Sequence, residues 1–210
     1  MDVQADKVKR ALALLRDLVR VIPRAKIMLT YDTPWECLVA VQLSAQCTDK
    51  KVNEITPALF RKYPRFEDYL SADRKEFEWL IFQSGFYRNK TKNILAAAVY
   101  IQNVHGGVVP RTMQEMLLIP GVARKTANVV LGAVYGVVDG IAVDTHVYRL
   151  ARQWGLSKAA TPMGVERDLM ALFPRRSWYS LTYRMIEYGR AYSPARKKNH
   201  DDEPLRSYYL

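Results

Sequence analysis

Two side chains in the stretch from Leu118 to His146, those of Lys125 and Asp144, are suited to covalent chemistry on a sugar. An unprotonated lysine amine is a nucleophile that can attack a sugar carbon. A nearby carboxylate can take up a proton, or stabilise the positive charge that grows on a deoxyribose ring as its base leaves. Both residues also have ordinary interpretations: Lys125 is one of 32 lysines and arginines, and an aspartate before an apolar helical run is usually a helix cap.

The residues around Lys125 predict two helices joined by a tight turn. Thr112 and Glu115 have the spacing of a capping box, which favours a short helix that ends near Pro120. Pro120 and Gly121 then break the chain. A second helix is predicted beyond them, because apolar or small side chains recur there at helical intervals: Val122, Thr126, Val129, Val130 and Ala133.

The start of this second helix favours an anion. Its first backbone N–H groups have no partner within the helix and lie at the positive end of the helix dipole, so they suit a phosphate oxygen without reading any base. The same positive end, together with the neighbouring Arg124, disfavours the protonated form of Lys125. That is the direction in which an ammonium group becomes a nucleophile.

Asp144 stands at a junction between two predicted elements. Residues 141–143 read as buried extended chain, and Val147 to Leu150 reads as the opening of another helix. Asp144 is therefore either an N-cap and nothing more, or a carboxylate that acts together with Lys125, and the residues alone leave both interpretations open.

The two motifs LIPGVARKTANVVLGAVYG and IAVDTH closely resemble the helix-hairpin-helix DNA glycosylases, and among them the endonuclease III group, from about Tyr31 to Arg190. By this resemblance Lys125 is the Schiff-base nucleophile and Asp144 the essential carboxylate. Ala123 departs from the family, which usually has a second glycine there, so that a requirement for positive φ would weaken phosphate binding. The resemblance also implies DNA contacts at Gly121, Val122, Ala123, Arg124, Thr126 and His146.

Two further segments resemble parts of the family that enter the duplex. In LSAQCTD, the family's glutamine fills the space left by a flipped nucleotide, and Gln46 has the donor and acceptor for that role, with Thr48 beside it. In GFYRNK, Phe86 stands where the family usually has a wedging leucine, and Arg88 and Lys90 are predicted phosphate contacts. Without the resemblance, Gln46 reads as a surface residue at a helix end and Phe86 as core.

The composition fits a protein that binds nucleic acid, and it argues against a disulfide-stabilised, metal-binding, secreted or membrane-spanning protein. The net charge is +11, and basic side chains that contact phosphates release counterions from DNA. Cys37 and Cys47 are too few for a disulfide framework or a four-thiolate metal site, and the histidines are too scattered for a metal. No signal peptide or membrane span is recognisable. Two cysteines suit a reducing cytosol, and the protein is expected to be cytoplasmic, nucleoid-associated and monomeric.

The C-terminal tail is the largest departure from the family. Most endonuclease III proteins hold an iron–sulfur cluster with four cysteines after a Gly-Arg pair, whereas residues 191–210 contain no cysteine and Ser193 stands near the first ligand position. An oxygen donor and His200 cannot replace four thiolates, so no cofactor is expected. Packing of tail side chains, among them Tyr192, Pro194, Tyr208 and Tyr209, is predicted to hold this segment instead.

The sequence therefore predicts an all-α protein. By resemblance it has two lobes: a six-helix barrel over 26–137, with the hairpin at about 112–134, and a second helical domain over 1–25 and 138–210 that lacks the cluster. The implied function is a bifunctional DNA glycosylase and abasic-site lyase, which removes oxidised pyrimidines from double-stranded DNA and nicks the abasic site through a lysine Schiff base. The alternatives are a mismatch-specific thymine or uracil glycosylase, an adenine glycosylase of the same fold, and a non-catalytic helix-hairpin-helix DNA-binding module.

The sequence also predicts a helix near the N-terminus that packs one face into the core. Val8, Leu12, Leu15, Leu18 and Val19 predict the buried face of a first helix, which ends before Pro23.

Overall fold

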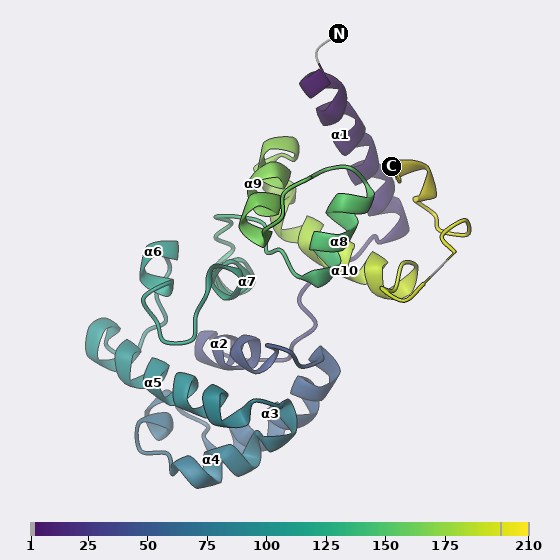
Figure 1. Ribbon diagram of the computed structural model, residues 1–210. Coiled ribbons are helices and arrows are strands. Elements are labelled where there is room, and N and C mark those ends of the chain that lie inside the picture. The colour runs from purple at the N-terminus through teal and green to yellow at the C-terminus, as the bar shows by residue number, and fades with distance from the viewer. Residues whose placement is uncertain (1–2, 198, 210) are drawn as a thin grey trace. The chain divides into compact units, whose positions relative to one another are not determined.

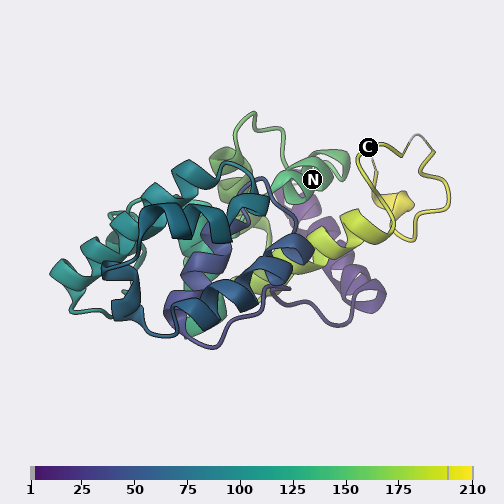
Figure 2. The same cartoon turned by 90° about the horizontal axis from the view of Figure 1, so that it is seen from below.

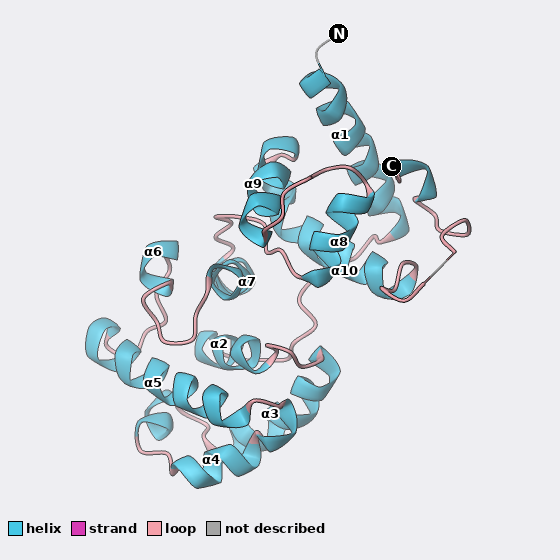
Figure 3. Cartoon of the chain, viewed as in Figure 1, coloured by secondary structure: helices cyan, strands magenta, loops and turns pink. Residues whose placement is uncertain are grey.

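The computed structural model describes residues 3–197 and 199–209, and within them the chain forms helices and loops with no β-strand (Figure 3). The predicted all-α fold is confirmed. The chain divides into two compact units, one formed by residues 28–137 and the other by residues 1–27 together with 138–210 (Figure 1). Among the described residues, each helix is too short or too polar to pass through a lipid bilayer.

The unit of residues 28–137 contains six of the described α-helices. They are α2 (Pro34–Leu43), α3 (Asp49–Lys62), α4 (Arg74–Leu80), α5 (Tyr87–His105), α6 (Met113–Met116) and α7 (Arg124–Tyr135), with short 3-10 segments η1 (Phe66–Leu70) and η2 (Phe82–Ser84) between them.

Helix α2 lies at the centre of this unit and positions much of the candidate site. Thr33 caps it with a complete capping box, and Pro34 occupies its first turn. Every residue from Cys37 to Leu43 is buried, because α3, α5 and α7 all pack against this helix. A helix that is apolar on all sides requires such surroundings. The end of α2 is thereby fixed in place.

The other unit contains α1 (Val3–Val21), α8 (Thr145–Gln153), α9 (Pro162–Leu172) and α10 (Trp178–Ala191), and the 3-10 segments η3 (Arg175–Ser177) and η4 (Arg206–Tyr208). The side chains of all four helices meet in one apolar core, in which Trp154 and Tyr188 are fully buried and in ring contact. Large aromatic rings contribute much of the area buried in such a small core.

The buried face of α1 differs from the predicted one. The helix does end before Pro23, and Leu18 is buried, but Leu12 and Val19 are 44% and 39% exposed, whereas Ala11 and Leu14 are fully or almost fully buried. The sequence ALALL offers apolar residues on adjacent faces of the helix, so periodicity alone does not select between them.

The C-terminal segment returns from the end of α10 and packs on its own unit (Figure 2). Tyr192, Tyr208 and Tyr209 contact the core, as predicted for the tail tyrosines. Arg10 of α1 donates to the carbonyl of Tyr208, and the Tyr208 hydroxyl donates to Asp17. The tail is therefore attached to the first helix by both packing and polar contacts.

Candidate active site and DNA-contacting turns

The predicted hairpin is formed by α6, a tight turn and α7. Thr112 caps α6 through the N–H of Glu115, as its spacing predicted, but the helix ends at Met116 and not near Pro120. The proline disfavours helical backbone at Ile119, and residues 117–119 form tighter turns instead. The N–H of Val122 donates to the carbonyl of Ile119 at 3.1 Å, which closes a turn with Pro120 and Gly121 at its centre.

Gly121 is required both by the turn and by its neighbours. Its φ of +75° lies in the left-handed region, and a Cβ built on it would lie 2.7 Å from the Cβ of Asn93 on α5. The Nε2 of Gln42, at the end of α2, donates to the carbonyl of Pro120 at 3.1 Å. Two other helices of the same unit therefore hold the turn, and neither Gln42 nor Asn93 was predicted to do so.

The start of α7 has the features expected of an anion site. Its N-cap, Ala123, provides no side-chain acceptor, and no acidic residue lies in its first turn. Ala123 has φ −95° and ψ 169°, an extended conformation that alanine adopts without strain, so the departure from glycine carries no conformational cost. The prediction for Val122 needs a correction: its side chain is buried and its N–H is used within the turn, so neither is free for a phosphate.

Lys125 is the second residue of α7 and its side chain is exposed. Arg124 and Thr126, on either side of it, are half-buried, and the helix is anchored from the next turn on by buried Ala127 and Asn128. The amine is therefore accessible to solvent, while the backbone that carries it is fixed by packing.

Asp144 caps α8. Its Oδ1 accepts the backbone N–H of Val147 at 2.8 Å, which leaves the other carboxylate oxygen outside this bond. The half-buried ring of His146 packs against α10, because a Cβ on Gly189 would lie 2.6 Å from its Nδ1. The cap interpretation of Asp144 is correct, and a cap of this geometry still permits a second role for the carboxylate.

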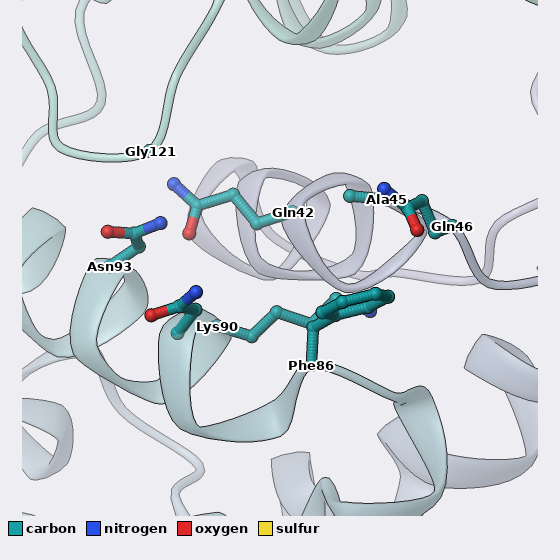
Figure 4. Close-up of a pocket in the computed structure, with 8 residues that line it drawn as sticks. Gln42, Ala45, Gln46, Phe86, Lys90, Asn93 and Gly121 are labelled. Carbon is teal, nitrogen blue, oxygen red and sulfur yellow. The ribbon is translucent and has the colours of Figure 1, made fainter.

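Gln46 and Phe86 lie in two turns that line the same pocket in the unit of residues 28–137 (Figure 4). Gln46 follows α2 and Phe86 is the N-cap of α5, and both side chains are exposed, Phe86 to 63%. The pocket has a volume of about 210 Å³, and Gly121 of the hairpin also lines it. Thr48, exposed, caps α3 through the N–H of Lys51.

Of the two phosphate contacts predicted beside Phe86, Arg88 is exposed to solvent and Lys90 is buried. Arg88 is exposed, with its guanidinium 5.5 Å from the centre of the Tyr87 ring. Lys90 is only 6% exposed, and its Nζ donates to the carbonyls of Leu43 and Ser84, each at 2.8 Å. The direct phosphate contact predicted for Lys90 is therefore wrong, because its ammonium is buried and used by the protein itself.

The tail contains a buried polar network around Ser193 and Glu203. Ser193 is fully buried; its Oγ accepts from Arg149 at 3.0 Å and lies 3.1 Å from the Tyr209 hydroxyl. The Tyr209 hydroxyl donates to Glu203, which is 4% exposed and also accepts from the Tyr188 hydroxyl at 3.2 Å. No local pattern in the sequence predicts this network, because Arg149 lies 44 residues from Ser193 along the chain and Tyr188 lies 15 residues from Glu203.

The charge at the centre of this network is stabilised. Burial by itself acts to raise the pKa of Glu203, but the hydrogen bonds from Tyr209 and with His200 outweigh it and lower the pKa below the usual 4.5. The carboxylate is thus held ionised in the folded protein. Its contribution to stability is present above about pH 4.5 and is lost as the pH falls through the lowered pKa.

The residues present do not fit an iron–sulfur cluster. Nowhere in the described ranges do three or more His, Cys, Asp or Glu side chains gather closely enough to hold a metal ion. Both cysteines belong to the unit of residues 28–137, whereas the tail belongs to the other unit. Burial raises the pKa of the Cys37 thiol to about 12, which disfavours the thiolate that a metal requires.

The chain is similar to known DNA repair proteins over most of its length. Residues 39–175 match the model of the HhH-GPD superfamily of base excision DNA repair proteins. The chain is 49% identical to Endonuclease III of Synechocystis sp. over 193 residues, which are 92% of this chain and 88% of the relative.

Two solved structures are similar in fold and sequence. A non-covalent Endonuclease III–DNA complex matches with a TM-score of 0.92 and 37% identity, covering 96% of this chain and 94% of that one. A trapped Endonuclease III–DNA covalent intermediate, an estranged-adenine complex, matches with a TM-score of 0.87 and 38% identity, covering 90% and 89%.

Proposed function

The chain belongs to the HhH-GPD superfamily of base excision DNA repair proteins, and from this premise we propose that it is a bifunctional DNA glycosylase and abasic-site lyase acting on duplex DNA. The observation that carries the proposal is Lys125: an exposed amine in the first turn of α7, in a chain 38% identical to a protein that has been trapped covalently on DNA. Oxidised pyrimidines are the proposed lesions. The enzyme would act as a monomer at the nucleoid.

The hairpin binds the DNA backbone in this proposal. The first N–H groups of α7 and the positive end of its dipole receive a phosphate oxygen, with Arg124 and Thr126 beside them. Gly121 allows the turn to approach the backbone closely, and its packing on Asn93 fixes the turn beforehand. Phosphate contacts of this kind set the register of the protein on the duplex but carry no sequence information.

The chemistry then takes place at the sugar of a nucleotide that has left the stack. The Lys125 amine, after losing its proton, attacks C1′; the bond from C1′ to the base breaks, and the base leaves with the electron pair and gains a proton. Asp144 stabilises the positive charge that develops on the sugar, or takes up the proton of the amine. The nitrogen lone pair then breaks the bond from C1′ to the ring oxygen O4′, which gains a proton, so that the sugar ring opens and C1′ forms a Schiff base with Lys125. Loss of a C2′ proton from this Schiff base expels the 3′ phosphate, and water then releases Lys125.

Gln46 and Phe86 serve the flipped state. A flipped nucleotide leaves a gap in the base stack, and Gln46 can fill it while its amide donates to and accepts from the orphaned base. The exposed ring of Phe86 can stack on a neighbouring base, with Arg88 near the phosphates.

Incision of four duplexes tests this function against the alternatives. The duplexes contain thymine glycol, uracil, a mismatched thymine or an abasic site, each otherwise fully paired. We expect base release and strand cleavage at thymine glycol, and cleavage at the abasic site. Release of uracil or mismatched thymine without cleavage would favour the mismatch glycosylase. Binding to all four without reaction would favour the non-catalytic module.

We also propose that this enzyme works without an iron–sulfur cluster, and that the network around Glu203 holds the tail in its place. The support is the buried Ser193 near the first ligand position, bonded to Arg149, and the carboxylate that joins Tyr188 to Tyr209. Hydrogen bonds to an ionised group are stronger than those between neutral groups, so one buried carboxylate can fix several segments at once.

The purified protein is expected to be colourless, to contain no iron by metal analysis, and to keep its melting temperature in a chelator. Glu203→Ala should lower the free energy of unfolding by about 3 kcal/mol at pH 7, because it leaves buried hydroxyl groups without an acceptor. Asp201→Ala, in the same turn but exposed, should change it by less than about 0.5 kcal/mol. The difference between the two variants should shrink as the pH falls below 4.5.

Brown protein with stoichiometric iron would contradict this proposal. So would equal stability of the two variants in thermal unfolding at pH 7.

A further inference from the structure

Gln46 and Phe86 share an unusual backbone conformation. Among the described residues they are the two with positive φ that are not glycine, at 53° and 48°. Residues with a Cβ occupy this left-handed region at a cost in energy, and they stay there only where the surrounding structure holds them. Each of these turns therefore needs a restraint.

One side chain binds the residues that lead into both turns. Lys90 extends from the first turn of α5, and its Nζ donates to the carbonyl of Leu43, the last residue of α2, and to that of Ser84, the last residue of η2. Leu43 comes three residues before Gln46, and Ser84 two before Phe86. The backbone N–H of Lys90 also donates to the carbonyl of Phe86, at 3.1 Å. In Figure 4, Lys90 and Phe86 lie on one side of the pocket, and Gln42, Ala45 and Gln46 on the other.

A lysine is a costly choice at this position. Burial lowers the pKa of Lys90, and a positive charge in the first turn of α5 is disfavoured by the dipole of that helix. None of the ion pairs found in the described ranges involves it. What the ammonium gains is the two carbonyls, of which that of Leu43 lies at the negative end of α2. An apolar side chain would avoid these costs but could not join the two turns.

We propose that Lys90 is a positioning residue for entry into the duplex: by joining the turn of Gln46 to the turn of Phe86, it makes the two side chains insert as one unit. This inference rests on the proposed function, in which both side chains act on the flipped state. Lys90 itself touches neither the DNA nor the reacting atoms. Its removal should therefore impair opening of a paired helix far more than the chemistry on a sugar that is already accessible.

Two substrates separate these steps: an abasic site in a fully paired duplex, and the same site inside a short unpaired bubble. Lys90→Met keeps an apolar stem of similar length and removes the donors. We expect its single-turnover incision rate to fall at least about tenfold on the paired duplex and less than about twofold on the bubble. Fluorescence of 2-aminopurine opposite the site should report the same loss of opening, before cleavage.

Lys92→Met is the matched control, since it removes an exposed lysine from the same helix. It should leave the ratio of the two rates unchanged. If thermal unfolding shows that Lys90→Met is not folded, Lys90→Gln replaces it. The glutamine amide can donate to one of the two carbonyls, so an intermediate change in the ratio of the two rates is expected.

Equal losses on both substrates, or no loss on either, would overturn the positioning role. The proposed function fails separately, and only if the wild-type protein cleaves neither substrate. The proposed function is thus tested by the wild-type protein, and the positioning role by the ratio of rates for the Lys90 variants.

Discussion

Lys125→Ala is expected to lower the rate of incision at an abasic site by about 1,000-fold or more. Alanine has no amine to form the Schiff base from which the 3′ phosphate is eliminated. The exposed position of Lys125 predicts that folding is unaffected, because its side chain contributes nothing to the core. Single-turnover cleavage of a labelled duplex, with protein in excess, measures the loss in the chemical step directly.

Lys50→Ala is the matched control. Lys50 is also an exposed lysine and also the second residue of its helix, α3, so its replacement removes the same charge from an equivalent position. We expect a small effect on DNA affinity and an incision rate close to that of the wild-type protein. Equal rates for Lys125→Ala and the wild type would assign the nucleophile to another residue.

Asp144→Asn is expected to lower the rate of base release by about 100-fold or more while the protein stays folded. The asparagine oxygen can still accept the N–H of Val147, so the cap on α8 is kept and only the charge is lost. Asp144→Ala should lose the cap as well, and with it about 1 kcal/mol of stability. Base release from thymine glycol duplexes and thermal unfolding of the same preparations separate the two effects.

Asp73→Asn provides the comparison, because Asp73 caps α4 in the same way, through the N–H of Glu76 at 2.8 Å. That variant should keep full activity. If Asp144→Asn also keeps it, Asp144 is a cap and has no part in the reaction.

The local features of the site could be predicted from the sequence. Pro120 and Gly121 define the turn, and the apolar spacing after it defines α7, because both follow from backbone restrictions and periodicity within a few residues. The capping box of α2 likewise depends only on residues close together in the sequence. Asp144 was correctly read as preceding a helix, although spacing alone could not tell whether the carboxylate does more than cap it.

The features that depend on distant contacts could not be predicted. The sequence suggests that Lys90 is a surface lysine among other basic residues. Nothing near it in the sequence indicates that its ammonium donates to the carbonyl of Leu43, 47 residues away. The same holds for Glu203, whose partner Tyr188 lies 15 residues away along the chain. On α1, two apolar faces competed, and only packing against the other helices of its unit buries Leu14 in preference to Leu12.

The central claim is that the amine of Lys125 forms a covalent bond with the sugar. Borohydride reduces a Schiff base to a stable amine, so the wild-type protein, incubated with an abasic duplex and borohydride, should yield a covalent protein–DNA adduct. After digestion, mass spectrometry of the adduct should place the sugar on Lys125. An adduct on any other lysine or on the N-terminal amine, or no adduct under conditions in which the strand is cleaved, would contradict the account.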